Sequence, residues 1–317
     1  MNSNAMMKLK MSGTGFLIFL FLTCHISGAQ ETWCKFRRTA PLMGTDFSLT
    51  FYASSSELAA RAAAAAFERV EQLNQIFSDY LEDSEVTKLS ATAGSGRRIA
   101  VSNDLWYLLK YAKRLSRQSG GAFDITIGPL TKLWRRGVRQ QEYPDAAKIA
   151  RARALVNHRW VKLYPRQKKV KLKKPGMRLD FGGIAKGYAV DQAYEVLEQR
   201  FGITSAIIDG GGDLFIAAPP PDGSSWEIKN INSTSISAQH YRAMASSGDT
   251  YRYLQWQGKR YSHILEPSSG LGKVDSSVVT VIASNTTLAD ALATTFTVAS
   301  EAVKKKLKKK YDIEIIN

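Results

Sequence analysis

The segment 206–282 constrains the fold most, because it consists of short apolar runs separated by turn residues. Runs of this length that contain β-branched and aromatic residues are typical of strands. No stretch of helical spacing lies between them, so we predict a mostly antiparallel sheet. The expected strands are 206–209, 213–217, 226–229, 241–246, 251–256, 260–265 and 277–282.

Segments with helical spacing precede and follow this block. An alternating strand is expected at 45–52, and two short strands at 160–163 and 168–173 form a hairpin. The chain has no internal repeat and no linker longer than a loop. We therefore predict the α+β fold class, with a single large domain of mostly antiparallel sheet and packed helices over residues 30–317. The expected helices are 56–77, 103–116, 184–199 and 288–300.

The first thirty residues have the pattern of a secretory signal. Lys8 and Lys10 precede an apolar run at 16–22, and small residues follow at 27–29. The apolar run is roughly half of the ~20 residues that a bilayer-spanning helix needs. We therefore predict a signal segment over residues 1–29 and an exported, periplasmic protein.

The processing of this segment has two alternatives. Cys24 follows Leu22 and Thr23 in a pattern that resembles a bacterial lipobox, but threonine replaces the usual small residue before the cysteine. Lipidation of Cys24 gives an inner-membrane lipoprotein, associated with the membrane through an N-terminal lipid anchor. Cleavage after Ala29 instead leaves Cys34 as a lone thiol, which we expect to be exposed and without a structural role.

The net charge of +16 comes from 44 basic and 28 acidic residues. We expect no nucleic-acid partner, because the signal exports the chain and aromatic residues are not interleaved with the basic runs. Lysines at 168–174 alternate with apolar residues, which predicts an edge strand protected against pairing. The six lysines at 304–310 follow an expected helix, and we interpret them as solvated charge, with an anionic membrane surface as the alternative.

Three glycine-containing segments carry candidate chemistry. In 179–191, Gly182 and Gly183 lie between a strand and a helix, where backbone N–H groups can bind phosphate oxygens. The spacing fits neither a P-loop nor the GxGxxG motif. The segment 209–213 is typical of a tight turn between strands, and 120–126 combines glycines with an aromatic ring and a carboxylate. Each segment alone leaves a purely structural role open.

Polar groups near the C-terminus add a base and a metal-binding pair. His263 ends a strand, and histidine is a side chain that can act as a general acid or base near neutral pH, although a histidine in such a position is more often structural. Asp290 and Thr294 are four residues apart on an expected helix, so their side chains share one face. Their oxygens suit Mg²⁺. The alternative is an acid near a helix N-terminus together with a core-facing threonine.

Taken in order, these motifs resemble those of the ApbE-type flavin transferases, also called FAD:protein FMN transferases. The resemblance runs from Pro41 to Thr294 and implies an ApbE-like fold. It also implies an enzyme that cleaves FAD at its pyrophosphate with Mg²⁺ and transfers FMN to a threonine or serine hydroxyl of an exported redox protein, releasing AMP. The motifs are M-G-T at 43–45, S-D-Y at 78–80, G-A-F-D-I-T at 121–126, D-x-G-G-I-A-K-G-Y-A-V-D at 180–191, D-G-G-G-D at 209–213, H-I-x-x-P-x-S-G at 263–270 and A-D-A-L-A-T at 289–294.

The resemblance implies roles for individual residues as well. His263 is implied to help deprotonate the acceptor hydroxyl. Mg²⁺ is implied to bind Asp290, Thr294 and a backbone carbonyl at Gly183. The residues implied to contact FAD are Met43 and Tyr80 at the flavin, Ala122, Phe123 and Asp124 at the adenosine or ring portion, Asp180 and Lys186 at polar groups, and Ile264 packed on the cofactor.

Two other functions remain as alternatives. An exported FAD pyrophosphatase would yield FMN and AMP with water as the acceptor, and it would need the same metal but no surface for an acceptor protein. A non-catalytic flavin-binding protein would store or deliver FAD, and His263 would then be dispensable.

Overall fold

The computed structural model of the 317-residue chain describes residues 24–25, 33–229, 235–238, 242–248, 253–274 and 278–316. Except for Cys24 and His25, the predicted signal segment lies outside the described residues, so that boundary stays a prediction. None of the helices in the described ranges combines the length and apolar composition that a membrane crossing requires.

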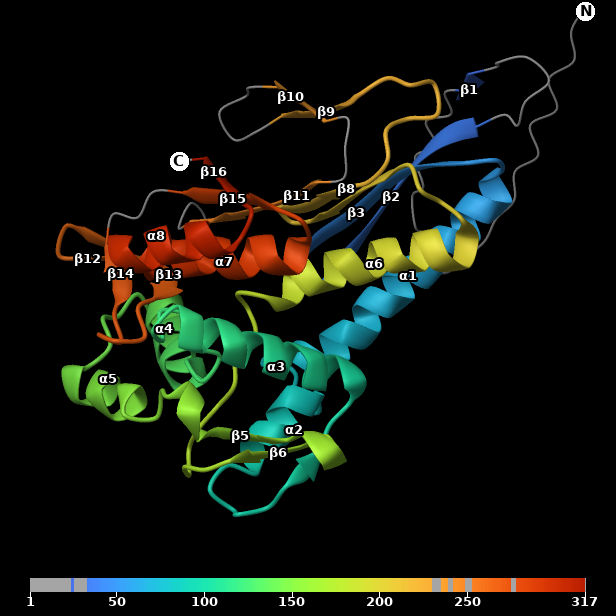
Figure 1. The fold of residues 1–317 in the computed structure, drawn as a ribbon. Coiled ribbons are helices and arrows are strands. Elements are labelled where there is room, and N and C mark those ends of the chain that lie inside the picture. Colours follow the sequence, from blue (N-terminus) through green and yellow to red (C-terminus); the bar gives the residue numbers. More distant parts are fainter. Residues whose placement is uncertain are drawn as a thin grey trace, which may run out of the picture.

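An eight-stranded sheet forms the upper layer of the molecule in Figure 1. Its neighbouring strands pair antiparallel, as predicted. In spatial order the strands are β1 (Cys24–His25), β2 (Trp33–Leu42), β3 (Thr45–Ala53), β7 (Ala206–Gly210), β8 (Asp213–Ile216), β11 (Arg242–Ser247), β15 (Val279–Ala283) and β16 (Glu314–Ile316).

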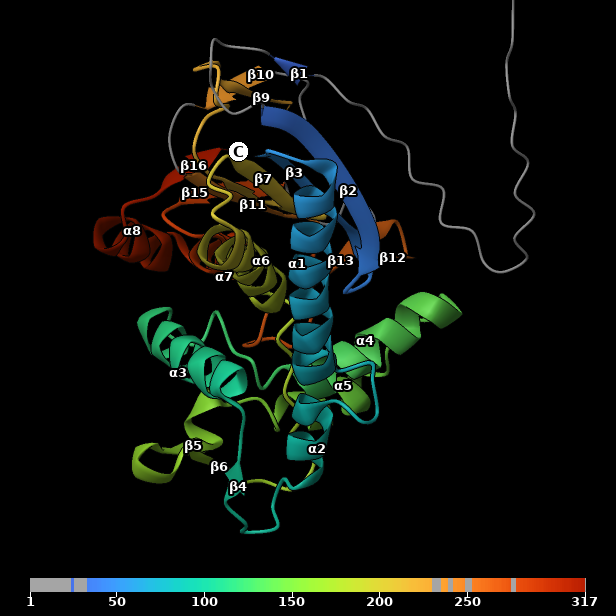
Figure 2. The ribbon, with the colours of Figure 1, turned by 90° about the vertical axis from the view of Figure 1, so that its right-hand side faces the viewer.

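Eight helices occur in the described part of the chain. Of these, α1, α6 and α7 lie against the lower face of the main sheet (Figure 1). Figure 2 shows that α1 runs down the molecule from the sheet to α2. The helices are α1 (Ser56–Phe77), α2 (Glu85–Ala91), α3 (Asn103–Gln118), α4 (Gly128–Gln140), α5 (Ala146–Arg153), α6 (Ala185–Phe201), α7 (Thr286–Val298) and α8 (Glu301–Lys310).

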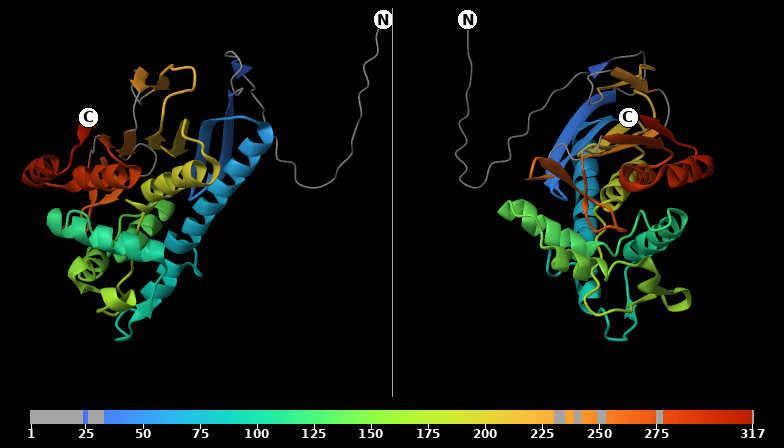
Figure 3. Two further views of the ribbon diagram at one scale, coloured as in Figure 1. Left: turned by 45° about the vertical axis from the view of Figure 1, so that its right-hand side comes forward. Right: turned by 90° about the vertical axis from the view of Figure 1, so that its left-hand side faces the viewer.

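Three small antiparallel sheets also occur among the described residues. In both views of Figure 3, α4, α5 and the sheet β4-β6-β5 lie beyond α6 and α7, on the side that faces away from the main sheet. The small sheets are β4 (Ile99–Ala100), β6 (Lys169–Leu172) and β5 (Val161–Tyr164); β10 (Ser235–Ala238) and β9 (Trp226–Lys229); and β12 (Tyr253–Trp256), β13 (Lys259–Leu265) and β14 (Gly272–Val274).

Alanines let α1 pack closely on its neighbours. The helix begins where the Ser55 side chain accepts a hydrogen bond from the Leu58 N–H, and it buries one alanine-rich face that includes Ala59, Ala62 and Ala66. Small side chains bring helix backbones close together, and α1 makes extensive contacts with α6. This face joins α1 to the main hydrophobic core, which extends from the sheet into α3 and the β5–β6 hairpin.

A second, separate hydrophobic cluster lies between α4, α5 and the sheet β12-β13-β14. Leu130, Trp134 and Ile149 pack there against Leu254 and Leu265. The indole N–H of Trp134 donates to the carbonyl of Gly270 at 2.9 Å, so the helix and the turn after β13 are joined by a directional bond as well as by packing.

The structure confirms the α+β prediction and the helix at 56–77, and it corrects two expectations, which concern β6 and Cys34. The lysine-bearing strand β6 is central rather than an edge strand, because β4 pairs on its other side. The lysines at 304–310 follow α7, as expected, and lie in a further helix, α8, where they are mostly exposed and only Leu307 is buried. Cys34 is buried, because alternate side chains of β2 face the core. Parts of the strands expected at 241–246, 251–256 and 277–282 lie outside the described residues.

Gly187 marks the point where α6 crosses α7. A Cβ at this position would lie 2.3 Å from the Thr286 carbonyl oxygen and 2.8 Å from Asp290 Cβ, so any larger residue forces the helices apart. We predict that Gly187→Ala lowers the free energy of unfolding by about 1–3 kcal/mol, the usual cost of overpacking. Urea unfolding measures this, with Gln199→Ala on the exposed part of α6 as the control. Helix propensity alone predicts a gain of about 1 kcal/mol, and observing that gain would contradict the close crossing.

Candidate active site

The crossing of α6 and α7 brings together the three residues implied to bind a metal. Gly183 lies just before α6, and a Cβ there would lie 2.9 Å from Thr294 Oγ1. Asp290 lies one turn before Thr294 on α7, and its Oδ2 accepts the Gly187 N–H at 3.0 Å. Thr294 is the one residue of α7 that is not buried. Packing alone therefore requires glycine at position 183.

These groups fit a small hard cation. A carboxylate, a hydroxyl and a backbone carbonyl are the oxygen donors that Mg²⁺ accepts, usually together with water and substrate phosphate. The described residues contain no cluster of three or more histidine, cysteine, aspartate or glutamate side chains that could hold a metal. The candidate site here combines one carboxylate with uncharged oxygens, and metal binding itself stays a prediction.

A buried ion pair lies beside this site. Lys186 Nζ lies 2.5 Å from Asp213 Oδ2, and the Asp213 side chain is only 2% exposed. Burial, and then the charge of Asp213, raises the pKa of Asp290 to about 8, while Lys186 opposes the shift. Burial alone would lower the pKa of Lys186, but Asp213 and Asp290 raise it above its usual value. Sequence reasoning missed Asp213, although it is the second acid of the D-G-G-G-D motif.

Two tight hairpin turns meet at the edge of the site. Between β7 and β8, Gly211 and Gly212 have φ of +74° and +95°, which confirms the predicted turn. A Cβ on Gly211 would lie 2.1 Å from Thr45 Oγ1, so the turn is in contact with the start of β3. The neighbouring β2–β3 turn consists of Met43 and Gly44, with φ of +51° and +76°.

Met43 therefore occupies a backbone conformation that favours glycine. A non-glycine residue in the left-handed region costs about 1–2 kcal/mol, and such residues cluster at binding sites. Its side chain is half-buried and packs against the main core. The conformation is consistent with the predicted flavin contact of Met43 and does not test it.

An arginine that sequence reasoning missed links two other predicted residues. Arg135 of α4 bonds Asp79 Oδ2 at 2.6 Å and Asp180 Oδ2 at 3.1 Å, and its guanidinium lies 4.2 Å from the centre of the Tyr80 ring. Both carboxylates are buried, whereas Tyr80 is 67% exposed. Burial, and then the charge of Asp180, raises the pKa of Asp79, and Arg135 opposes that shift. The Arg178 side chain also bonds the Asp79 carbonyl.

The predicted segment 122–124 lies at the base of this region. Phe123 is buried in the main core, and Ala122 beside it is half-buried. Asp124 is buried and accepts hydrogen bonds from the N–H and hydroxyl of Thr126 and from the N–H of His158. The carboxylate of Asp124 thus holds two backbone segments together. A contact of these three residues with a ligand stays a prediction.

His263 lies in an irregular stretch of β13. Tyr261 pairs with Val274 and Leu265 with Gly272, so four residue steps on β13 face two on β14. Bulges of this kind re-aim side chains and are frequent near active sites. His263 is exposed, whereas its neighbour Ile264 is buried, and β13 packs against both α4 and α7. The strand that carries the predicted base therefore contacts the helix that carries the candidate metal ligands.

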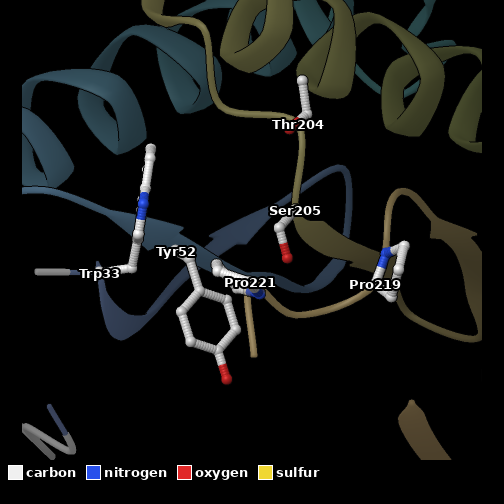
Figure 4. Close-up of a pocket in the computed structure, with 6 residues that line it drawn as sticks. All are labelled: Trp33, Tyr52, Thr204, Ser205, Pro219 and Pro221. Carbon is white, nitrogen blue, oxygen red and sulfur yellow. The ribbon is translucent and has the colours of Figure 1, made fainter. Parts of the chain in front are cut away.

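Two surface pockets lie away from these residues. The first is at the end of the β2–β3 hairpin opposite the Met43–Gly44 turn (Figure 4). The second lies beside the turn that follows β13. Neither contains a predicted site residue. The first is lined by Trp33, Tyr52, Thr204, Ser205, Pro219 and Pro221, and the second by Ala150, Arg153, Ala154, Val156, Trp160, Pro267 and Ser268.

Comparison with known proteins identifies relatives over most of the chain. The ApbE family model matches residues 43–316. An FAD:protein FMN transferase from Klebsiella pneumoniae is 33% identical over 256 residues, covering 78% of this chain and 77% of that protein. One from Vibrio cholerae is 28% identical over 301 residues, covering 90% of this chain and 88% of that protein.

Solved structures of ApbE proteins are also similar to this chain over most of its length. The apo form of the Pseudomonas stutzeri flavinyl transferase ApbE has a TM-score of 0.78 and 28% identity, covering 89% of this chain and 90% of that one. The ApbE protein of Thermotoga maritima has a TM-score of 0.77 and 29% identity, covering 89% and 94%.

The Lys186–Asp213 pair generates a stability prediction. Lys186→Met leaves Asp213 and Asp290 buried without their cation, and breaking a fully buried pair costs about 3–5 kcal/mol. Because the Lys186 side chain is 31% exposed, we expect a smaller loss of about 2–3 kcal/mol. Chemical denaturation of Lys186→Met and of Lys186→Met/Asp213→Asn measures it. The double variant should regain most of the lost free energy of unfolding. A Lys186→Met protein as stable as the unchanged protein would show that the ion pair does not contribute to folding.

Proposed function

This chain belongs to the ApbE family and is a transferase, and we propose that it moves FMN from FAD onto a threonine or serine hydroxyl of an exported redox protein, with Mg²⁺ bound and AMP released. The observation that carries the proposal is the convergence of Gly183, Asp290 and Thr294 beside Lys186. These are oxygen ligands and a cation gathered at one helix crossing, which is what an anionic pyrophosphate requires.

Charge compensation is the first requirement of the reaction. Asp290, Thr294 and the Gly183 carbonyl would hold Mg²⁺, which would neutralise negative charge on the pyrophosphate. Lys186 adds a fixed positive charge that Asp213 holds in place. The chain thus provides both a candidate cation site and a fixed positive charge for one dinucleotide.

Ring binding is the second requirement. The exposed ring of Tyr80 has Arg135 against it and remains accessible for a flat ligand ring. Met43 and Ile264 offer apolar contacts from other elements, and the family resemblance assigns Met43 to the flavin and Ile264 to packing on the cofactor. Aromatic stacking of this kind contributes about 0.5–1.5 kcal/mol beyond buried area.

Proton removal is the third requirement. In the transfer, the acceptor hydroxyl oxygen forms a bond to the FMN phosphorus, the bond from that phosphorus to the AMP oxygen breaks, and the hydroxyl proton is lost. We assign acceptance of that proton to an imidazole nitrogen of His263, which is exposed to an incoming protein and lies on a strand that contacts α7. The signal pattern at 1–29 supports export of the enzyme to the compartment of an exported acceptor.

Incubation with FAD, Mg²⁺ and a candidate acceptor peptide, followed by mass spectrometry, tests the proposal. A transferase attaches FMN to a threonine or serine of the peptide and releases an equal amount of AMP. Release of FMN and AMP without a peptide adduct would instead support an FAD pyrophosphatase. FAD binding without either product would support a non-catalytic flavin-binding protein.

Asp290→Asn should abolish most Mg²⁺-dependent cleavage of FAD. The amide keeps the shape and an acceptor for the Gly187 N–H but loses the charge that a cation needs. Several kcal/mol of transition-state stabilisation correspond to about a 10²- to 10³-fold loss of rate. AMP release measured against Mg²⁺ concentration gives the result, with a thermal melt confirming the fold. Undiminished AMP release would mean that α7 carries no ligand.

His263→Ala should lower the rate of FMN transfer by about 10²- to 10⁴-fold, the usual contribution of one general base. FAD affinity should barely change, because the role assigned to His263 concerns the acceptor. Adduct formation and FAD affinity are measured in the same variant between about pH 5 and 9, across the usual range of histidine titration. Lys259→Gln, on the same strand, is the control. Equal labelling rates in the two variants would remove His263 from the mechanism.

A further inference from the structure

Arg135 occupies a position that connects two parts of the candidate site. Its guanidinium contacts residues from two segments that are far apart in the sequence, Asp79 after α1 and Asp180 before α6. Neither a helical period nor a motif marks Arg135, and it is not among the residues that the family motifs supply. The structure nevertheless places it between the exposed Tyr80 ring and the loop that leads to Gly183.

On one side, Arg135 orients the loop 180–183. Asp180 uses its two oxygens differently, because Oδ2 accepts from Arg135 at 3.1 Å while Oδ1 accepts the Gly182 N–H at 2.7 Å. The Asp180 N–H is also bonded to the Ile125 carbonyl at 2.8 Å. With both ends of the carboxylate engaged, the path of the chain into Gly183 is fixed, and Gly183 is in contact with Thr294.

On the other side, Arg135 supports the Tyr80 ring. The guanidinium carbon lies 4.2 Å from the ring centre, within the range of a cation–π contact. The bond from Arg135 to the neighbouring Asp79, at 2.6 Å, fixes the backbone that carries the ring. A planar guanidinium can bond two carboxylates and stack on a ring at the same time, which a lysine ammonium cannot do.

The charges make this arrangement costly to take apart. The Asp79 and Asp180 side chains are 8% and 6% exposed, so removing the arginine leaves two nearby carboxylates in a poorly hydrated environment. Arg178 approaches Asp79 as well, but it bonds the backbone carbonyl rather than the carboxylate. Arg135 is therefore the residue whose hydrogen bonds join the two acids.

We propose that Arg135 is a positioning residue that couples the ring-stacking surface of Tyr80 to the metal-binding loop at Gly183, so that the ring and the pyrophosphate of one dinucleotide are bound by a single preorganised unit. The inference rests on the proposed function. In this role Arg135 makes no contact with the reacting atoms. Replacing Arg135 should therefore weaken both FAD binding and activation by Mg²⁺.

Arg135→Met, Arg135→Lys and Arg136→Met test this. Arg136 is the matched control, since it is exposed on the same helix and bonds only Gln140 among the described residues. A hydrogen bond to a charged group usually contributes enough free energy to change a binding constant by about 10- to 100-fold. We therefore expect the Kd for FAD to rise by about that factor in Arg135→Met. In the same variant, the Mg²⁺ concentration for half-maximal AMP release should rise about tenfold, with kcat at saturation changed by less than about threefold.

Arg135→Lys should restore little of the FAD affinity or of the Mg²⁺ activation. Arg136→Met should stay within about twofold of the unchanged protein in both measurements.

Flavin fluorescence supplies a readout that does not depend on turnover. Stacking on Tyr80 should quench the fluorescence of bound flavin in the unchanged protein. In Arg135→Met the quenching should be weaker when the same fraction of protein carries FAD. If Arg135→Met does not fold, Asp79→Asn provides the test, because weakening one arm of a coupled unit should raise both the Kd for FAD and the Mg²⁺ concentration for half-maximal AMP release.

An Arg135→Met protein that binds FAD and Mg²⁺ like Arg136→Met, with only a lower Tm, would overturn the inference. An Asp79→Asn protein that loses FAD affinity while its Mg²⁺ requirement stays unchanged would also contradict it, because the ring surface and the loop would then not be coupled. Failure of the unchanged protein to bind FAD would instead contradict the proposed function.

Discussion

A small group of buried charges at the crossing of α6 and α7 determines the geometry of the site. Asp191 of α6 accepts the N–H groups of Thr286 and Thr287 at 2.8 Å each, so it caps the first turn of α7. Lys186, five residues earlier, bonds Asp213 of β8. Buried carboxylates without such partners cost several kcal/mol each. The helices and the strand can therefore meet in only one register, and that register places Asp290 and Thr294 beside Gly183.

The rest of the site follows from elements that pack around this crossing. The close approach at Gly187 sets the distance between the helices, and the two hairpin turns at Gly211 and Met43 bring the edge of the main sheet to the same place. The second hydrophobic cluster, anchored by Trp134, holds α4 and β13 together. It thereby carries both Arg135 and His263. The crossing of α6 and α7 supports the candidate metal ligands, and the second hydrophobic cluster supports Arg135 and the predicted base His263.

Local patterns in the sequence were sufficient for much of the fold. Helical spacing placed α1 at its observed bounds, and the i, i+4 pair Asp290 and Thr294 lies on one helix as expected, because both signals depend on neighbours in the chain. Arg135 could not be found this way, since its partners are 56 and 45 residues distant. Pairing partners are equally non-local, which is why β6 proved to be a central strand. The bulge at His263 also has no local signature.

Crystals of the protein grown with FAD and Mn²⁺ test the site most directly, because anomalous scattering locates a metal without reference to activity. Mn²⁺ accepts the same oxygen donors as Mg²⁺. The structure predicts one peak in contact with an Asp290 carboxylate oxygen, Thr294 Oγ1 and the Gly183 carbonyl oxygen, next to the FAD pyrophosphate. A peak elsewhere on the chain, with bound FAD and no metal at these three atoms, would contradict the site.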